Sequence, residues 1–260
     1  MKIIIANWKA NPTTLDEAIE LFNAEVTAAQ KYPSVQTVIC PPFVYLEELS
    51  KQAISSKLIS SKQEVSLGSQ DVFWENPPAG GGPFTGEIST EMLKNFGVTH
   101  VLVGHSDRRY VLGETDEIIN KKVKAALEAG IIPILLVGER NKGDDRKAVL
   151  EEQLSKDLAD LATSQVGNIL IAYEPVWAVS TSPNAQPDTP ENTLEAIGFI
   201  NNFLAINYKL EAISCLYGGS VTEQNVADFL KYPEIGGAVI GGASLRKKEF
   251  ANILNIVSGL

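Results

Sequence analysis

Cysteine and histidine are scarce in this sequence, with two residues of each among 260. Cys40 and Cys215 fall in separate strand-like segments, and we expect buried free thiols because disulfides are rare in large cytosolic domains. No group of His, Cys and carboxylate residues has the spacing of a metal site, so the sequence predicts no metal. No G-x-G-x-x-G motif follows the first predicted strand, which argues against a dinucleotide, and we expect no cofactor.

Long apolar runs and an excess of positive charge are also missing. No run approaches the ~18 residues of a membrane span, and MKIIIANWK lacks the length and flanks of a signal peptide, so we expect a cytoplasmic protein. The 22 Lys and Arg residues are outnumbered by 32 Asp and Glu residues, giving a net charge of −10. Such a charge disfavours nucleic acid and anionic membranes as partners. An anionic substrate would need a local positive site.

Strand-like and helix-like segments alternate along the whole chain. The predicted strands are Lys2–Ala6, Gln36–Cys40, Glu64–Gly68, Thr99–Val103, Ile132–Val137, Ile169–Tyr173, Ser214–Tyr217 and Ala238–Ile240. Eight apolar strands, each followed by a helix, predict a parallel sheet covered by helices, and this length suits a single (β/α)8 barrel domain over residues 1–260. An open doubly wound sheet is the alternative.

The segments between the strands have helix-start and helix-stop chemistry. Thr14 and Glu17 form a capping-box pattern, and Thr115 precedes two acids in a run that stops at Gly130. The predicted helices are Leu15–Gln30, Tyr45–Ser55, Ser89–Phe96, Asp116–Ala129, Asp145–Thr163, Glu191–Asn207, Thr222–Leu230 and Lys247–Ser258. The connections Asp71–Gly86 and Pro175–Pro190 exceed the usual ~2–6 residues, which is typical of lids and binding loops.

Polar residues and glycines gather where the predicted strands end. They are Asn7 and Lys9, His105 and Ser106, Glu174, Gly218–Ser220, and Gly241 with Gly242. Each has an ordinary interpretation alone, as a surface charge, a helix cap or a turn glycine. In a barrel, however, strand ends meet on one face, and the loops after strands seven and eight often bind phosphate. A carboxylate base, an imidazole and an ammonium beside such a site predict proton transfer on a small phosphorylated molecule.

Five motifs from residue 7 to 245 resemble the triosephosphate isomerase family. They are NWKAN (7–11), VGHSDRR (103–109), AYEPVWA (172–178), LYGGSV (216–221) and IGGASL (240–245). The resemblance implies interconversion of dihydroxyacetone phosphate and D-glyceraldehyde 3-phosphate through an enediolate, a step of glycolysis and gluconeogenesis. Another barrel enzyme for a phosphorylated sugar, an isomerase or an aldolase, and a non-catalytic relative are the alternatives.

The resemblance also implies roles for individual residues. Glu174 would be the base, His105 the neutral electrophile, and Lys9 the stabiliser of negative charge, a division of work for which this family is itself a standard example. Three further side chains would support the site: Asn7, Ser106 and Asp107. Backbone N–H groups would bind the phosphate at Ser220, Gly241 and Gly242, joined by Ser180 from the lid.

Two regions differ from the family pattern or extend it. Asp71–Gly86 resembles the segment that inserts into a second subunit, so we expect a homodimer. Asp71 replaces the usual asparagine there, and Asp107 replaces a glutamate near Lys9. The lid has Ser180 and Ser182 where the family commonly has glycine, and a positive φ at either serine would store ~1–3 kcal/mol of strain.

Overall fold

Eight parallel strands close into a barrel in which each strand pairs with its neighbours in sequence and β1 pairs with β8. The computed structural model describes residues 1–55, 65–76, 82–211 and 213–260, and the predicted first residue of the third strand, Glu64, lies outside them. The strands are β1 Lys2–Asn7, β2 Val35–Cys40, β3 Val65–Ser69, β4 Val98–Val103, β5 Ile132–Val137, β6 Leu170–Tyr173, β7 Cys215–Tyr217 and β8 Ile235–Ile240. The predicted fold is confirmed.

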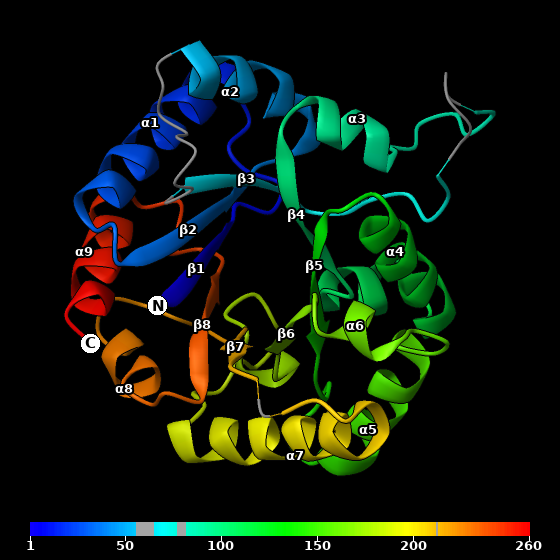
Figure 1. Ribbon diagram of the computed structural model, residues 1–260. Helices are drawn as coiled ribbons and strands as arrows, with labels where there is room; N and C mark the ends of the chain where they lie inside the picture. Colours follow the sequence, from blue (N-terminus) through cyan, green and yellow to red (C-terminus); the bar gives the residue numbers. More distant parts are fainter. Residues whose placement is uncertain (56–64, 77–81, 212) are drawn as a thin grey trace.

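Helices surround the barrel (Figure 1). They are α1 Leu15–Lys31, α2 Phe43–Ser55, α3 Thr90–Asn95, α4 Asp116–Glu128, α5 Arg146–Asp157, α6 Thr163–Val166, α7 Pro190–Tyr208, α8 Val226–Leu230 and α9 Lys247–Ser258. Two short turns of other types also lie at strand ends: the π-helix η1 Asp107–Val111 and the 3-10 helix η2 Val176–Ala178. No helix in the described part of the chain is both long and apolar enough to cross a membrane.

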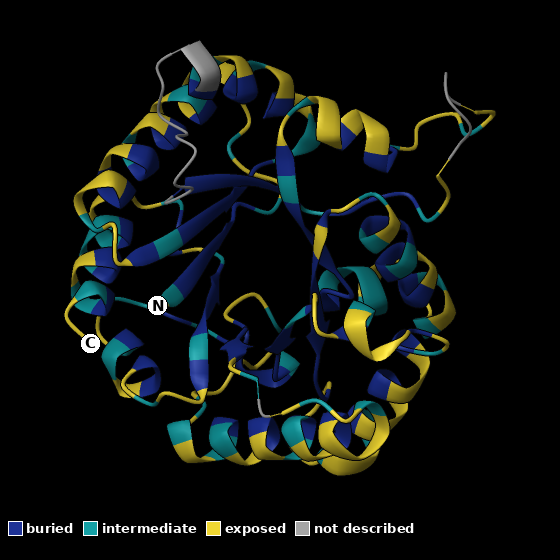
Figure 2. Ribbon diagram, in the orientation of Figure 1, coloured by how far each residue is buried: buried dark blue, intermediate teal, exposed yellow. Residues whose placement is uncertain are grey.

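Alternation along the strands produces two apolar layers. Within β1, Ile3 and Ile5 belong to a cluster made of strand residues, whereas Ile4 and Ala6 join a larger cluster that includes helix residues such as Phe22. The first cluster fills the barrel and the second lies between the strands and the inward faces of the helices (Figure 2). Both cysteines are buried and free, as predicted.

Side-chain caps fix several helix starts. The Thr14 hydroxyl accepts a hydrogen bond from the Glu17 backbone N–H and donates one to the Glu17 carboxylate, so Thr14 caps the start of α1. Thr115 likewise accepts from the Ile118 N–H at the start of α4. Gly130 follows α4 with φ +74°, a left-handed conformation that L side chains rarely adopt, and this explains why the helix stops there.

The predicted single helix Asp145–Thr163 is wrong, because the chain divides there into α5 and α6. Asp160 has φ +61°, which breaks the helical path. The Asn120 amide on α4 donates to the carbonyl oxygens of Asp157 at 2.9 Å and Ala159 at 3.0 Å. The break is therefore stabilised by a different helix, which local sequence does not reveal.

Two other boundaries differ from the prediction by three residues or more. The helix predicted to start at Thr222 starts at Val226, because Asn225 accepts from the Thr222 N–H at 2.8 Å and holds the preceding residues in a turn. The last strand begins at Ile235, three residues before the predicted start. Gly236 and Gly237 weakened the sequence signal for a strand. The strand nevertheless requires glycine at 237, because a Cβ there would lie 1.8 Å from the Ile3 carbonyl oxygen of β1.

Candidate active site at the carboxyl ends of the strands

A cavity of about 210 Å³ opens at the carboxyl ends of the strands. Every residue predicted as catalytic or substrate-binding lines it: Asn7, Lys9, His105, Glu174, Ser180, Ser220, Gly241 and Gly242. Ser106 and Asp107, predicted as supporting residues, contact the lining side chains. The fold therefore gathers in one place residues that are as far apart in the chain as Asn7 and Gly242.

Glu174 directly follows β6, and its backbone is tied to the end of β5. Its N–H donates to the Val137 carbonyl at 2.8 Å. A Cβ at Gly138 would lie 2.1 Å from the Glu174 carbonyl oxygen, so this close approach requires glycine. The buried carboxylate accepts two hydrogen bonds of 2.9 Å, one from the Ser106 N–H and one from the Ser106 hydroxyl. Ser106 thus fixes the carboxylate in this conformation.

His105 lies beside this carboxylate, with 3.3 Å between its Nε2 and Glu174 Oε1. The Asp107 backbone N–H donates to His105 Nδ1 at 3.1 Å. Since Nδ1 accepts this bond, the tautomer it favours carries a proton on Nε2, the nitrogen next to the Glu174 carboxylate in the cavity wall. The ring is therefore oriented as a hydrogen-bond donor toward a substrate.

Lys9 has a strained backbone, with φ +54° in the left-handed region. Two side chains hold it there: Asn7 Oδ1 accepts from the Lys9 N–H at 3.0 Å, and Gln70 Nε2 donates to the Lys9 carbonyl at 2.8 Å. Gln70 also donates to the Cys40 carbonyl at 2.9 Å, which anchors the strained residue to the end of β2. Such a conformation costs about 1–3 kcal/mol, and it persists only where contacts with surrounding residues hold the backbone in place.

The Lys9 ammonium lies between Asp107 and the lid. Its Nζ is 3.2 Å from Asp107 Oδ2 and donates to Thr181 Oγ1 at 3.0 Å. The shorter aspartate in place of the family's glutamate still reaches Lys9. The ammonium supplies local positive charge in a protein whose net charge is −10.

The predicted phosphate-binding backbone is only partly free in this conformation. The Ser220 N–H donates to the Ala178 carbonyl at 3.1 Å, so it must exchange this partner before it can bind an anion. Gly241 and Gly242 line the cavity after β8. Arg246 lines the same cavity and donates from Nη1 to the Gly242 carbonyl at 3.0 Å, which places a second cation beside these glycines.

The lid is anchored at its first hinge. Trp177 Nε1 donates to Glu139 Oε1 at 2.9 Å, and Ser182 Oγ donates to the Val176 carbonyl at 2.5 Å. Neither Ser180 nor Ser182 has a positive φ; the left-handed residue in this segment is Asn184, with φ +58°. The two serines therefore store no left-handed strain in this conformation.

Sequence reasoning overlooked three residues of this site: Gln70, Thr181 and Arg246. Gln70 directly follows β3, so the rule that selected the other strand-end residues could have found it. Thr181 and Arg246 carry no local signal, since their relevance comes from contacts with Lys9 and Gly242. Across the described ranges, with 56–64, 77–81 and 212 left out, no group of three His, Cys, Asp or Glu residues could hold a metal ion.

A sequence model of the triosephosphate isomerase family matches residues 2–257 of this chain. The chain belongs to the triosephosphate isomerase family. It is 41% identical over 260 residues to the triosephosphate isomerase of Dictyoglomus thermophilum, covering 97% of this chain and 98% of that protein. It is 40% identical over 257 residues to that of Endomicrobium trichonymphae, covering 97% of each chain.

A solved structure agrees with this family membership. The crystal structure of triosephosphate isomerase from Bartonella henselae superposes with a TM-score of 0.81, at 34% identity and with 98% of each chain covered. A triosephosphate isomerase is an isomerase enzyme with a (β/α)8 barrel, and both the barrel and the isomerase class extend to this family member.

Proposed function

We propose that this protein interconverts dihydroxyacetone phosphate and D-glyceraldehyde 3-phosphate, a reaction of glycolysis and gluconeogenesis. The observation that carries the proposal is the buried pair of Glu174 and His105, 3.3 Å apart, in a cavity that also contains the Lys9 ammonium. A carboxylate can move a carbon-bound proton, and an adjacent neutral imidazole with a cation can stabilise the oxyanion that results.

In this proposal Glu174 removes a proton from C1 of dihydroxyacetone phosphate, and the electron pair moves onto the carbonyl oxygen at C2 to form an enediolate. His105 Nε2–H donates to the substrate oxygens, and Lys9 stabilises the negative charge. The hydroxyl proton on the C1 oxygen then moves to the C2 oxygen, and Glu174 returns the carbon-bound proton to C2, so that C1 becomes the aldehyde carbonyl. The carboxylate must first exchange its bonds to Ser106 for contact with the substrate, because both of its oxygens accept from Ser106 here.

The phosphate would bind at the backbone N–H groups of Gly241, Gly242 and Ser220, with Ser180 added when the lid closes. Closure, for which this family is a standard example, would exclude water from the enediolate. Release of the Ser220 N–H from Ala178 would accompany closure, since one N–H cannot serve both acceptors fully. Arg246, beside Gly242, would add positive charge near the phosphate.

The test is a coupled assay that supplies glyceraldehyde 3-phosphate and detects dihydroxyacetone phosphate, and the reverse. We expect turnover in both directions without added metal or cofactor. Absence of turnover in cooperatively folded protein would overturn the proposal. Trapping of Lys9 by borohydride with substrate would point instead to aldolase chemistry, because only a Schiff base is reduced to a stable adduct.

We also propose that the whole chain forms one domain and that two copies form a dimer in the cytoplasm through the segment 71–86. The two ends of this segment are held together within the chain: Phe73 packs against Phe84 with ring centroids 4.7 Å apart and donates its N–H to the Ile88 carbonyl at 2.9 Å. At its base, Asp71 is 2.6 Å from Lys122 Nζ and 2.8 Å from Arg108 Nη2, so its added charge is compensated. Residues 77–81 of this segment lie outside the described part of the chain.

A further inference from the structure

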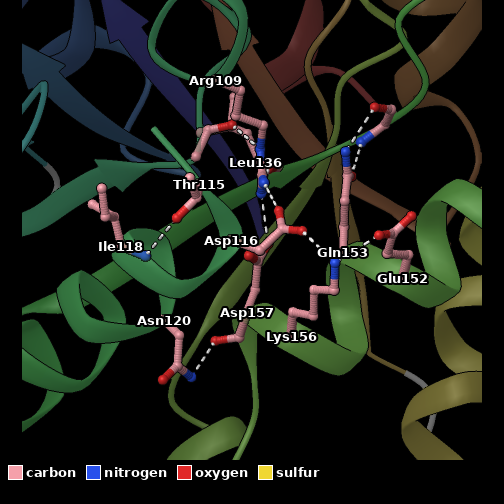
Figure 3. A network of polar contacts seen from close by, with 12 residues as sticks. Arg109, Thr115, Asp116, Ile118, Asn120, Leu136, Glu152, Gln153, Lys156 and Asp157 are labelled. Carbon is pink, nitrogen blue, oxygen red and sulfur yellow. Dashed lines mark hydrogen bonds and ion pairs between the residues drawn. The ribbon is translucent and has the colours of Figure 1, made fainter. Parts of the chain in front are cut away.

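Arg109, on η1, links the ends of two neighbouring strands (Figure 3). Its Nε donates to the carbonyl of Gly104, directly after β4, at 2.7 Å, and its Nη2 donates to the carbonyl of Leu136, in β5, at 3.1 Å. A Cβ at Gly104 would lie 2.7 Å from Nη2, so the guanidinium fills the space at this strand end. Its planar fork thus fixes the relative position of β4 and β5.

These two strand ends carry the proposed reacting groups. Gly104 directly precedes His105, and Leu136 directly precedes Val137, whose carbonyl accepts from the Glu174 N–H at 2.8 Å. A shift of either carbonyl would therefore change the 3.3 Å distance between His105 and Glu174. The Arg109 guanidinium binds Gly104, Leu136, Asp116 and Asp157, and the Arg109 backbone N–H donates to the His105 carbonyl at 3.1 Å, so its influence on the two reacting side chains is indirect.

Asp157 and Asp116 hold the guanidinium from its other side. Asp157 Oδ2, on α5, is 2.5 Å from Nη2, and Asp116 Oδ1, on α4, is 2.6 Å from Nη1. Asp157 is fully buried, and its second oxygen has no hydrogen-bond partner among the described residues. Burial of a carboxylate with an unpaired oxygen is expensive, and buried ion pairs often add little net stability. Orientation of Arg109 is therefore a better account of this carboxylate than stabilisation of the fold.

We propose that Asp157 is a positioning residue for proton transfer: it orients Arg109, and through Arg109 it sets the distance between His105 and Glu174. The inference rests on the proposed isomerase function. Of the two carboxylates, Asp157 is the decisive one, because it shares Nη2 with the Leu136 carbonyl, whereas Asp116 binds Nη1.

The experiment compares Asp157→Asn, Arg109→Lys, their double variant and the control Asn120→Ala. Asn120 binds the carbonyls of Asp157 and Ala159 at the end of α5 without touching Arg109, so its loss loosens the same helix junction. Since misplacement by ~1 Å can cost ~10²-fold in rate, we expect Asp157→Asn to lower kcat by roughly tenfold with KM little changed. Asn120→Ala should keep kcat within about twofold of the parent, because η1 is untouched.

The double variant tests the route of the effect. If Asp157 acts through Arg109, the loss in kcat of the double variant should be close to that of Arg109→Lys alone. If the fold-losses in kcat of the two single variants instead multiply in the double variant, Asp157 does not act through Arg109. A kcat for Asp157→Asn equal to that of the parent would overturn the positioning role itself, whatever the change in thermal stability.

A second readout does not depend on turnover. The chain has two histidines, and His100 lies near the opposite end of β4 from His105, so its ring signal is an internal NMR reference. We expect Asp157→Asn to shift the His105 ring signals and leave those of His100 in place. If the parent does not isomerise triose phosphates but this shift appears, the proposed function fails and the link between Asp157 and His105 stands. Unmoved His105 signals would overturn the link.

Discussion

Ser106 binds both oxygens of the Glu174 carboxylate, one through its backbone N–H and one through its hydroxyl. Each oxygen of the base thus already has a hydrogen-bond donor, and the length of the side chain determines what the base can reach once it is released from Ser106. Gly138 and Val137 fix its backbone, so the backbone cannot follow a shortened side chain toward the substrate.

The first prediction concerns Glu174→Asp. Retracting the carboxylate by one methylene moves it by about 1 Å, and we expect turnover to fall ~10²-fold while the fold is retained. The measurement is steady-state kinetics in the coupled assay, with circular dichroism to verify the fold. A variant as fast as the parent would show that Glu174 is not the base.

His100 gives a second prediction at the residue scale, and it concerns stability. Burial lowers the pKa of His100 from 6.5 to about 4. The unfolded chain therefore takes up a proton between pH 6.5 and 4 while the folded protein does not, so stability falls with falling pH. A shift of this size corresponds to about 3 kcal/mol lost across that window.

In His100→Gln this contribution is absent, and the stability difference between parent and variant should change by about 2–3 kcal/mol from pH 7.5 to pH 4.5. Urea unfolding of both proteins at the two pH values measures it. Because other titrating groups act equally in both proteins, a constant difference would mean that His100 does not titrate as described.

At the residue scale the sequence was most informative where a residue with a reactive or charged side chain directly follows a predicted strand. Lys9, His105 and Glu174 were predicted because each follows a strand and a barrel brings strand ends together. The hydrogen bond between Ser220 and Ala178 was not predictable, because it depends on the position of the lid. The role of Arg109 was also not predictable. From sequence alone an arginine is expected to be a surface charge, and only the structure shows the partners of its guanidinium.

At the scale of elements, the lid is the segment in which this chain differs most from the family pattern. Ser182 Oγ donates to the Val176 carbonyl at the first hinge, a bond that the family's usual glycine cannot form. The bond joins two positions of the lid and restricts its internal freedom. A lid with less internal freedom loses less conformational entropy when it closes over the substrate, so closure costs less free energy.

We therefore predict that Ser182→Ala lowers kcat/KM by a few-fold, mainly through a higher KM, since one neutral hydrogen bond contributes about 0.5–1.5 kcal/mol. Ser258→Ala is the matched control, because it removes a similar bond, from Oγ to the Asn255 carbonyl at 2.7 Å, in α9. The prediction fails if both variants match the parent, or if Ser182→Ala improves KM.

Helix and strand boundaries show why elements are predicted better than their ends. Thr14 and Thr115 cap their helices through neighbours within three residues, so the starts of α1 and α4 were readable. The end of α5 depends on Asn120, 37 positions away from Asp157, and no local pattern encodes such a contact. Alternation of apolar runs, by contrast, is a property of the whole chain, and it was sufficient to predict the barrel.

At the scale of the whole molecule, several large apolar side chains are left exposed. Val111, the last residue of η1, is 77% exposed, Leu112 directly after η1 is 63% exposed, and Val44 near the start of α2 is 81% exposed. η1 also contains Arg108, which binds Asp71 at the base of the segment 71–86. Val111, Leu112 and the segment therefore belong to one connected region, and burial of this region in a dimer would stabilise the side of the site that holds Asp107.

The last prediction tests that connection. A carboxylate at an apolar interface is costly to desolvate, so Val111→Glu should weaken self-association, and sedimentation across protein concentrations should show a larger fraction of monomer than in the parent. Ile206→Glu is the control: Ile206, on α7, is also an exposed apolar residue, 59% exposed. Because Lys9 is bound to Asp107 of η1, specific activity of Val111→Glu should fall on dilution in parallel with the dimer fraction. Equal sedimentation of the two variants would remove Val111 from the interface, and a parent that is monomeric at every concentration would refute the dimer.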